Sequence, residues 1–342
     1  MTSAARSRYI VSPPVDWVFF LLSPLLGLAL GIALSLGHVA LFDAAGPAAS
    51  GVFIGALIHA HLVAVFVRSH GRSHIRKRHP VRFFVVPALL FVALCSVDWL
   101  IVAALVVATF WDVWHSGAQT FGLSRIYDRN AGNDPSSMRR ADFALNQLLY
   151  AGPIFAGATL MAHVAVFEDF GDFDDPLSLV FARVPGAFEA HAHPLRLLVI
   201  AAGCVFAFFY LRAYVQARKG GYRMPLQKAV LLLSTGACAV YAWGFNSWGE
   251  AFFIMNFFHA IQYIALVWFQ ERDSLARSVG LHRRRGGQAL IGLAFFGSIT
   301  AYGVAVQWVD VEHRLFWALT MVVSLMHFWY DGFVWSVRRG DV

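Results

Sequence analysis

The chain has 342 residues, of which 58% are hydrophobic and only 14% are charged. Soluble domains are about half apolar and about a quarter charged, so this balance excludes an ordinary soluble domain and indicates that lipid is the solvent. The net charge of +7 does not indicate a nucleic-acid partner, because membrane topology and anionic headgroups explain basic residues that lie in short loops. The three cysteines lie inside apolar segments without metal-type spacing, which excludes a disulfide framework.

Apolar segments follow one another along the whole chain with only short breaks between them. A membrane-spanning helix needs roughly 20 mainly apolar residues. On this criterion the sequence predicts an all-α fold, a polytopic transmembrane helical bundle of about ten helices that forms a single integral membrane domain over residues 1–342. The predicted helices cover residues 15–36, 51–67, 82–97, 99–124, 143–167, 195–216, 228–247, 250–271, 288–308 and 314–337.

The loops between these helices alternate in charge, and cytoplasmic loops are the ones enriched in Lys and Arg. With the N-terminus inside, the inner loops are basic and the outer loops are acidic throughout. The basic loops are 68–82, 125–140, 218–228 and 272–285, followed by Arg338 and Arg339, and the acidic positions are 43, 98, 168–175 and 310–312. The alternation predicts cytoplasmic N- and C-termini and a multi-pass protein of the cell membrane, which would be the inner membrane of a bacterium.

Four of the predicted helices carry polar and ionisable residues near their middles, where such groups are costly and usually mark function. The segments are IHAHLVAVF, FWDVWHSGAQTFG, NFFHAIQY and MHFWYDGFVW. Residues three or four apart share one face of a helix. Polar stripes therefore arise from His115 with Gln119, from His259 with Gln262 and from His327 with Asp331.

One histidine from each of these four helices is predicted to ligate a metal at a common depth. Four imidazoles make a nitrogen-rich site that suits iron, copper or zinc. The chosen ligands are His59, His115, His259 and His327. His59 and His61 are two residues apart and cannot share a face, so only one of them is expected to point into the cluster, and His59 is the choice.

Four further residues are predicted to support the metal chemistry. Asp112 and Asp331 are expected to ligate the metal or to fix the histidine tautomers as hydrogen-bond acceptors. Gln119 and Gln262 are expected to hydrogen-bond substrate, oxygen or a ligand. Many aromatic residues flank these stripes, where they would either line a path for a long apolar or polyene substrate or pack against lipid.

This pattern resembles the Brp/Blh family of membrane β-carotene dioxygenases, in which intramembrane histidines on separate helices hold non-haem iron. The resemblance rests on His59, on His115 with Gln119, on His259 in FFHAIQY, and on His327 followed by Asp331. Where that family has a second histidine four residues after the first on one helix, this chain has Tyr263. The resemblance implies an iron centre and a carotenoid or another isoprenoid as substrate.

A second, partial resemblance lies in the basic loop after the second predicted helix. His70 and His74 form an HxxxH pattern there. Membrane fatty-acid desaturases and hydroxylases carry HxxxH boxes near the cytoplasmic face, so this loop resembles part of such a set. The sequence leaves open whether His61, His70 and His74 join the metal site.

The expected function is a membrane-embedded, metal-dependent oxidoreductase or oxygenase, with non-haem iron as the favoured cofactor and another transition metal as the alternative. The substrate would be a lipid or isoprenoid that enters laterally from the bilayer, and an electron-donor protein would be a partner. Two other functions stay open. A proton-coupled transporter or permease would use the intramembrane His and Asp residues, and a haem-binding membrane subunit would ligate haem through the histidines.

Overall fold

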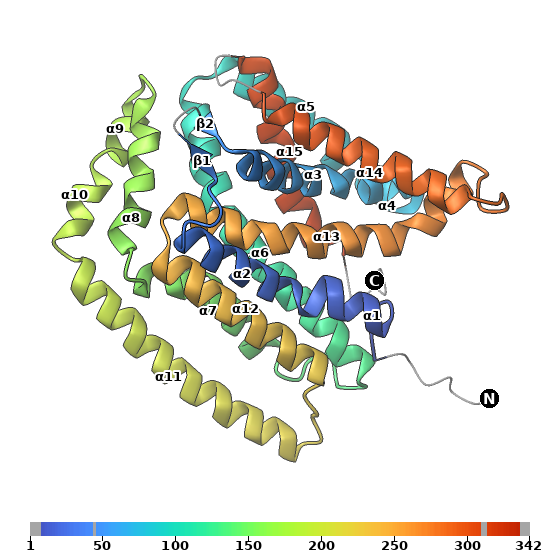
Figure 1. Cartoon of the computed structure of the whole chain (residues 1–342), viewed down its shortest axis with the longest axis horizontal. Coiled ribbons are helices and arrows are strands. Elements are labelled where there is room, and N and C mark those ends of the chain that lie inside the picture. Colours follow the sequence, from blue (N-terminus) through green and yellow to red (C-terminus); the bar gives the residue numbers. More distant parts are fainter. Residues whose placement is uncertain (1–7, 44–45, 309–312, 336–342) are drawn as a thin grey trace.

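The computed structural model of the chain describes residues 8–43, 46–308 and 313–335, and most of these residues are helical (Figure 1). The helices up to residue 130 are α1 (Pro13–Val15), the π-helix η1 (Asp16–Leu21), α2 (Ser23–Ser35), α3 (Ala49–Gly71), α4 (Ser73–Arg78), the π-helix η2 (Val81–Val85), α5 (Val86–Ser96) and α6 (Trp99–Asn130). The remaining helices are α7 (Arg139–Ala156), α8 (Leu160–Val164), the 3-10 helix η3 (Ala165–Asp172), α9 (Pro176–Phe181), α10 (Val184–Glu189), α11 (Ala192–Lys219), α12 (Leu226–Phe245), α13 (Trp248–Ser278), α14 (Gly287–Val306) and α15 (Arg314–Val334). Two-residue strands β1 (Phe42–Asp43) and β2 (Gly46–Pro47) pair antiparallel.

Seven helices within the described residues are long and apolar enough to cross a membrane, and the number rises to eight if one bent helix pair counts as a span. The prediction of an all-helical membrane bundle is confirmed at this level. Each of the ten predicted segments coincides with helical structure, but not all ten meet the criterion for a span. The segment Val81–Ser96 is a shorter apolar helix, and α15 is not among the seven. Residues 310–312 and 336–339, which include predicted charged and helical positions, lie outside the described residues.

The predicted helix 143–167 is wrong as a single straight span. The chain bends by 105° between α7 and the helical stretch Leu160–Asp172. Pro153 lies inside α7, where it cannot donate a backbone hydrogen bond. Gly157 then adopts an extended conformation and ends the helix. A Cβ atom at Gly157 would lie 2.6 Å from the carbonyl oxygen of Trp243, so only glycine permits this approach of α7 to α12.

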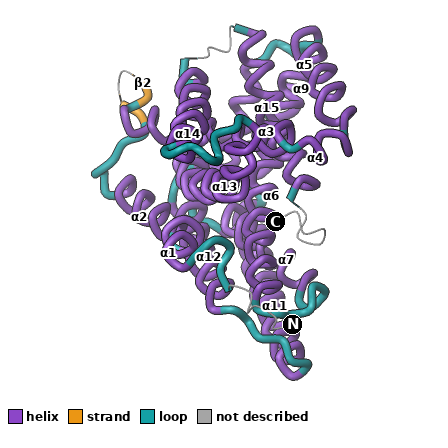
Figure 2. The backbone as a smooth tube through the Cα atoms, turned by 90° about the vertical axis from the view of Figure 1, so that its right-hand side faces the viewer, coloured by secondary structure: helices purple, strands orange, loops and turns teal. Residues whose placement is uncertain are grey.

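The helices form two groups that lie one above the other in both ribbon views (Figures 1 and 2). In the upper group α3 packs against α13, α14 and α15. In the lower group α12 packs against α2, α6 and α7. Helix α13 joins the groups because it contacts both α3 and α2. The α3–α14 contact is a direct backbone approach, since a Cβ at Gly303 would lie 2.0 Å from the carbonyl oxygen of Ala56.

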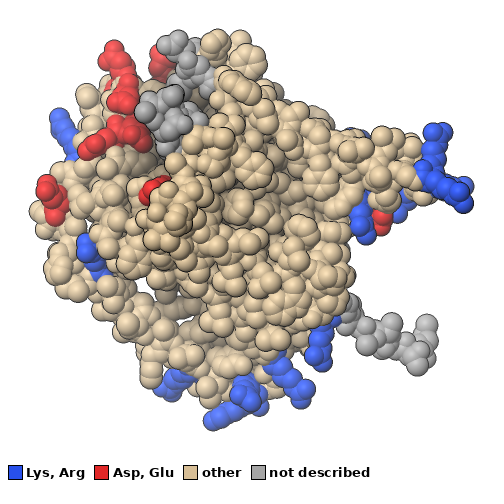
Figure 3. All heavy atoms as spheres, viewed as in Figure 1, with Lys and Arg blue, Asp and Glu red and all other residues tan. Residues whose placement is uncertain are grey.

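Charged side chains gather at opposite ends of the molecule, and the broad surface between them carries few Lys, Arg, Asp or Glu side chains (Figure 3). Acidic side chains lie at the upper left, around α9 and the neighbouring short helices. Lys and Arg side chains lie mainly at the lower edge, where α11 ends, and at the right, where α13 meets α14. This separation matches the alternation of acidic and basic loops in the sequence.

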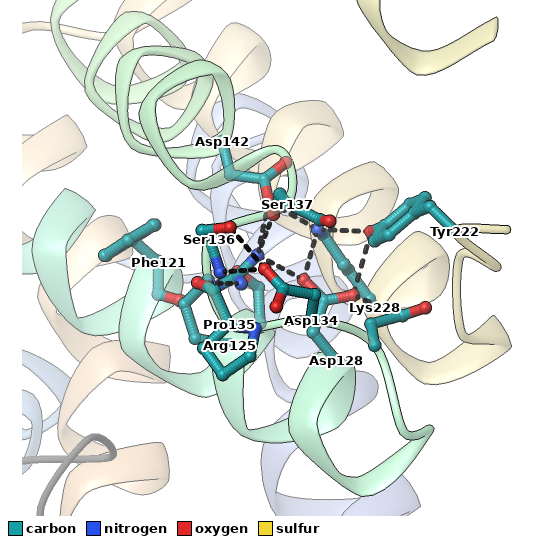
Figure 4. Close-up of polar contacts among 12 residues, drawn as sticks. Phe121, Arg125, Asp128, Asp134, Pro135, Ser136, Ser137, Asp142, Tyr222 and Lys228 are labelled. Carbon is teal, nitrogen blue, oxygen red and sulfur yellow. Dashed lines mark hydrogen bonds and ion pairs between the residues drawn. The ribbon is translucent and has the colours of Figure 1, made fainter. Parts of the chain in front are cut away.

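A buried network of four charges ties α6, α7 and α12 together at the basic end of the bundle (Figure 4). The Lys228 Nζ atom lies 2.7 Å from Asp128 Oδ2 and 2.6 Å from Asp142 Oδ2. The Arg125 Nη1 atom lies 2.6 Å and 3.0 Å from the same two oxygens. The Tyr222 hydroxyl donates to Asp128 Oδ1, and burial beside Asp128 raises the pKa of Tyr222, which keeps the hydroxyl a donor. Two cations thus balance two carboxylates, as buried charges require.

Candidate metal centre

Four buried histidines meet where the central helices cross. His61 comes from α3, His115 from α6, His259 from α13 and His327 from α15, and each is at most 3% exposed. The rings form a closed cycle of neighbours. The distance between ring centres is 5.0 Å from His61 to His259 and 4.9 Å from His61 to His327. It is 5.1 Å from His115 to His259 and 4.8 Å from His115 to His327. The structure therefore brings together three of the four predicted ligands, with His61 as the fourth.

The structure differs from the sequence prediction in which histidine of α3 faces the cluster. The Nδ1 atom of His59 lies 2.8 Å from the carbonyl oxygen of Gly55 and 3.2 Å from Nε2 of Gln307, the residue that follows the end of α14. His59 therefore faces α14, and His61 faces the other three histidines. The reason is the packing of α3 between α13, α14 and α15, which gives this helix two buried faces. The spacing of two residues shows that His59 and His61 lie on different faces of α3, but it does not show which face meets the cluster.

Asp331 completes a compact group of ligand atoms with His115 and His327. The two Nε2 atoms lie 3.1 Å apart, and they lie 3.7 Å and 3.8 Å from Asp331 Oδ2. A point equidistant from three atoms at these separations lies about 2.1 Å from each, and bonds from zinc to nitrogen or oxygen ligands measure about 2.0–2.2 Å. The distances between these three atoms therefore fit a divalent first-row metal ion.

His61, His259 and His327 form a second group whose ligand atoms all lie within 4.8 Å of one another. Among the described residues, neither ring nitrogen of His61 or His259 makes a hydrogen bond of normal geometry, and the same holds for Nδ1 of His327. Buried polar atoms without partners are costly and therefore rare in folded proteins. A metal ion among these nitrogens would satisfy them, so this part of the cluster also fits a metal.

Two aromatic side chains fix the orientation of the Asp331 carboxylate. The Tyr263 hydroxyl donates to Oδ1 at 2.6 Å, and Trp335 Nε1 donates to the same oxygen at 3.0 Å. Because Oδ1 accepts both bonds, Oδ2 is left facing His115 and His327. Donors of this kind orient metal-binding carboxylates in proteins. Tyr263 and Trp335 are not among the residues predicted from the sequence, although each follows a cluster residue by four positions, His259 and Asp331 respectively.

A buried ion pair supports Trp335 from the basic side of the bundle. The guanidinium of Arg68 lies 3.9 Å from the centre of the Trp335 ring, and its Nε donates to the backbone carbonyl of Val334. Arg68 also pairs with Glu271 at 2.6 Å, and Glu271 binds Arg72 at 2.5 Å. These contacts join α3, α13 and the end of α15 immediately beside the histidine cluster.

The other predicted site residues lie near the cluster but point to different partners. Asp112 accepts a hydrogen bond from Asn256 at 2.9 Å and does not belong to either group of ligand atoms. Gln262 donates to the carbonyl oxygen of Phe20 at 2.9 Å. Gln119 donates to Gln262 Oε1 at 3.2 Å, and its own Oε1 is buried without a described partner. Gln119 therefore has an acceptor atom, Oε1, that is available for a further hydrogen bond.

The HxxxH pattern of the basic loop is not part of this cluster. His70 lies 2.8 Å from the Ser69 hydroxyl and 3.3 Å from the carbonyl oxygen of Phe83. His74 is exposed on α4. Neither residue belongs to a group of potential ligands among the described residues. The structure therefore separates the loop histidines from the intramembrane ones.

A cavity of about 120 Å³ opens beside His115 and Asp331, between α6, α13 and α15. Most of its wall is apolar, and Gln119 and Tyr263 add polar atoms next to the ligands. Trp114, which also lines it, is 46% exposed. Because the same cavity touches buried ligands and exposed side chains of the apolar belt, it leads from the lipid-facing surface to the cluster.

No family model, curated protein or solved structure matches the chain. Any functional conclusion therefore rests on the geometry and chemistry of the site itself.

Proposed function

We propose that this protein is a membrane-embedded, metal-dependent oxidoreductase, a non-haem iron oxygenase that acts on a lipid or isoprenoid. One observation carries the proposal: four buried imidazoles and one carboxylate converge in the middle of the bundle, with several ring nitrogens unpaired. His61, His115, His259, His327 and Asp331 would hold the metal. Donors of this number and kind exceed what interhelical hydrogen bonding requires.

The donor set favours iron over other metals. Iron(II) held by histidines and a carboxylate keeps open positions at which it binds and activates oxygen. No described cysteine belongs to either ligand group, so the site lacks the soft thiolates that select copper(I). The carboxylate of Asp331, held by Tyr263 and Trp335, supplies the one oxygen donor.

The residues around the proposed metal suit an apolar substrate. The cavity wall includes Trp114, Leu266 and Phe328, which would pack against a hydrocarbon chain and exclude water. The free Oε1 of Gln119 would accept a hydrogen bond from a hydroxyl group on the substrate. Because the cavity reaches the apolar surface, a lipid or isoprenoid such as a carotenoid would enter sideways from the bilayer. A donor protein would be the partner for reactions that need electrons beyond those of the substrate.

The proposal also includes the location of the protein in the cell membrane and its orientation there. All ten apolar segments would cross the cell membrane, with both termini in the cytoplasm and the acidic loops outside. The separation of acidic and basic side chains in Figure 3 supports this orientation. The histidine cluster would then lie near the middle of the bilayer, because His115 lies halfway along the 32-residue helix α6.

Isotope labelling tests the proposed chemistry. Purified protein loaded with iron(II) would be placed in nanodiscs with a lipid extract rich in isoprenoids, a reductant and isotopically heavy oxygen gas. Mass spectrometry should then find a lipid product that carries the heavy isotope, with His59→Ala active and His61→Ala inactive. An absence of labelled product with every extract would contradict an oxygenase. Substrate uptake by metal-free protein in liposomes would instead indicate a transporter, and a Soret band would indicate haem.

A further inference from the structure

A second, larger groove lies between α7, α11 and α12, and no residue of the histidine cluster lines it. Its volume is about 560 Å³. Leu149 and Pro153 of α7 line one side, Val240 of α12 lines the next, and Leu197 and Ile200 of α11 close it. Figure 1 shows α11 at the outer edge of the bundle, and α7 is the helix that it contacts most. Ala192 is the only buried residue of this helix within the described part of the chain, so the groove is open to lipid.

The extent of the groove matches one leaflet of a bilayer. Its lining on α11 runs from His193 to Gly203, a distance of about 15 Å at 1.5 Å per residue. The hydrocarbon core of a bilayer is about 30 Å thick, so the groove covers half of it. The lining residues of α7 and α12 also come from one end of each helix, the end next to the acidic short helices. A single acyl chain fits this depth.

The end of the groove carries positive and polar groups. His193 and Arg196 line it one helical turn from each other at the start of α11. No ion pair or hydrogen bond joins Arg196 to another described residue. A guanidinium binds phosphate through paired hydrogen bonds, and its stem can lie along apolar surface while the charge stays at the interface. An anionic headgroup is the partner that this end of the groove lacks.

We propose that this groove binds one anionic phospholipid, whose acyl chain lies between α11 and α7 and whose phosphate is bound by Arg196 and His193. The bound chain fills the space that separates α11 from α12. The lipid therefore acts as part of the fold and holds α11, which packs mainly on α7, against the bundle. The proposal does not depend on the histidine cluster or on its metal.

Two substitutions probe the two ends of the groove separately. Arg196→Gln removes the charge at the headgroup end. Gly203→Phe fills the deep end, and no described atom lies within 4 Å of a Cβ built at Gly203, so the new side chain displaces lipid rather than protein. Phenylalanine is also a better helix former than glycine, so α11 should be preserved. Arg212→Gln is the matched control, because Arg212 is exposed on the same helix and does not line the groove.

The test is native mass spectrometry of the full-length protein in detergent, titrated with phosphatidylglycerol or with phosphatidylcholine. We expect one tightly bound phosphatidylglycerol and much weaker binding of phosphatidylcholine. Arg196→Gln should weaken phosphatidylglycerol binding about five-fold, the loss expected for one cation near an anionic headgroup. Gly203→Phe should abolish the tight site, and Arg212→Gln should leave it unchanged.

Three results would overturn the proposal: equal binding of the two lipids, full retention of the tight site by Gly203→Phe, or equal losses in Arg196→Gln and Arg212→Gln. Size-exclusion profiles and metal content of each variant establish that the bundle is intact. Because Arg196→Gln alters only an exposed end of α11, its result stands even if the glycine variant misfolds. A loss of metal in wild-type protein would affect the proposed function but not this site.

Discussion

The Nε2 atoms of His115 and His327 lie 3.1 Å apart, although 212 residues separate the two histidines in the chain. Two neutral imidazoles can share one hydrogen bond in this arrangement, but Asp331 Oδ2 lies within 3.8 Å of both nitrogens. Three donor atoms thus converge on one point from α6 and α15. Convergence of this kind is expected of metal ligands and is not needed to pack two helices.

Replacing Tyr263 by phenylalanine should weaken metal binding without abolishing it. The change removes the hydroxyl that donates to Asp331 Oδ1 and leaves all the proposed ligands in place. Loss of an orienting partner typically costs about 10–100-fold in metal affinity. Titration against a competing chelator measures the effect, with Tyr241→Phe on α12 as the control. An affinity equal to that of the wild type would show that Tyr263 does not position the carboxylate.

Filling the cavity beside the cluster should separate substrate binding from metal binding. Gly332 lines this cavity, and no described atom lies within 4 Å of a Cβ built there. Gly332→Leu should therefore occupy the cavity, lower the formation of labelled product at least ten-fold, and leave the metal content unchanged. Gly297→Leu on α14, where a Cβ is equally unobstructed, is the control. Equal activity of the two variants would mean that substrate does not use this cavity.

The buried charge network should be essential for stability. Lys228→Met leaves the carboxylates of Asp128 and Asp142 with only Arg125 as a cationic partner. Breaking a buried ion pair from one side costs about 3–5 kcal/mol, because a charge remains buried without compensation. The midpoint of thermal unfolding in detergent should fall clearly, whereas Lys219→Met, at an exposed position, should not change it. Similar midpoints for the two variants would contradict a structural role for the network.

The proposed orientation can be tested by labelling single cysteines in whole cells. In a variant without the three native cysteines, a cysteine at Asp172 should react with an impermeant maleimide from outside. A cysteine at Arg284 should react only after the membrane is opened, because its basic loop is proposed to be cytoplasmic. The opposite pattern, or external labelling at both positions, would contradict the orientation.

Helix positions followed from the sequence because the length of an apolar run is a local property. All ten predicted segments coincide with helical structure. The break at Gly157 did not follow, since it depends on how closely α7 approaches the backbone of α12. The short helical segment Val81–Ser96, by contrast, agrees with the predicted segment 82–97 to within one residue at each end.

From the sequence, only those site residues could be predicted that depth and helical spacing single out. Depth and the spacing of three or four residues selected His115, His259, His327 and Asp331, and the structure gathers all four. The choice between His59 and His61 needed the tertiary packing of α3, which buries both faces of that helix. Tyr263 stands where the resembled family has a histidine, so that resemblance gives it no role, yet its hydroxyl contacts Asp331.

The most direct test of the metal centre compares the two histidines of α3, which are only two residues apart. Elemental analysis of purified wild-type protein should find iron at a constant ratio to protein. His61→Ala should lose most of it, because His61 faces the cluster, and His59→Ala should keep it, because His59 faces Gln307. Wild-type protein that binds no stoichiometric metal after incubation with iron(II), or equal metal contents in the two variants, would contradict the assignment.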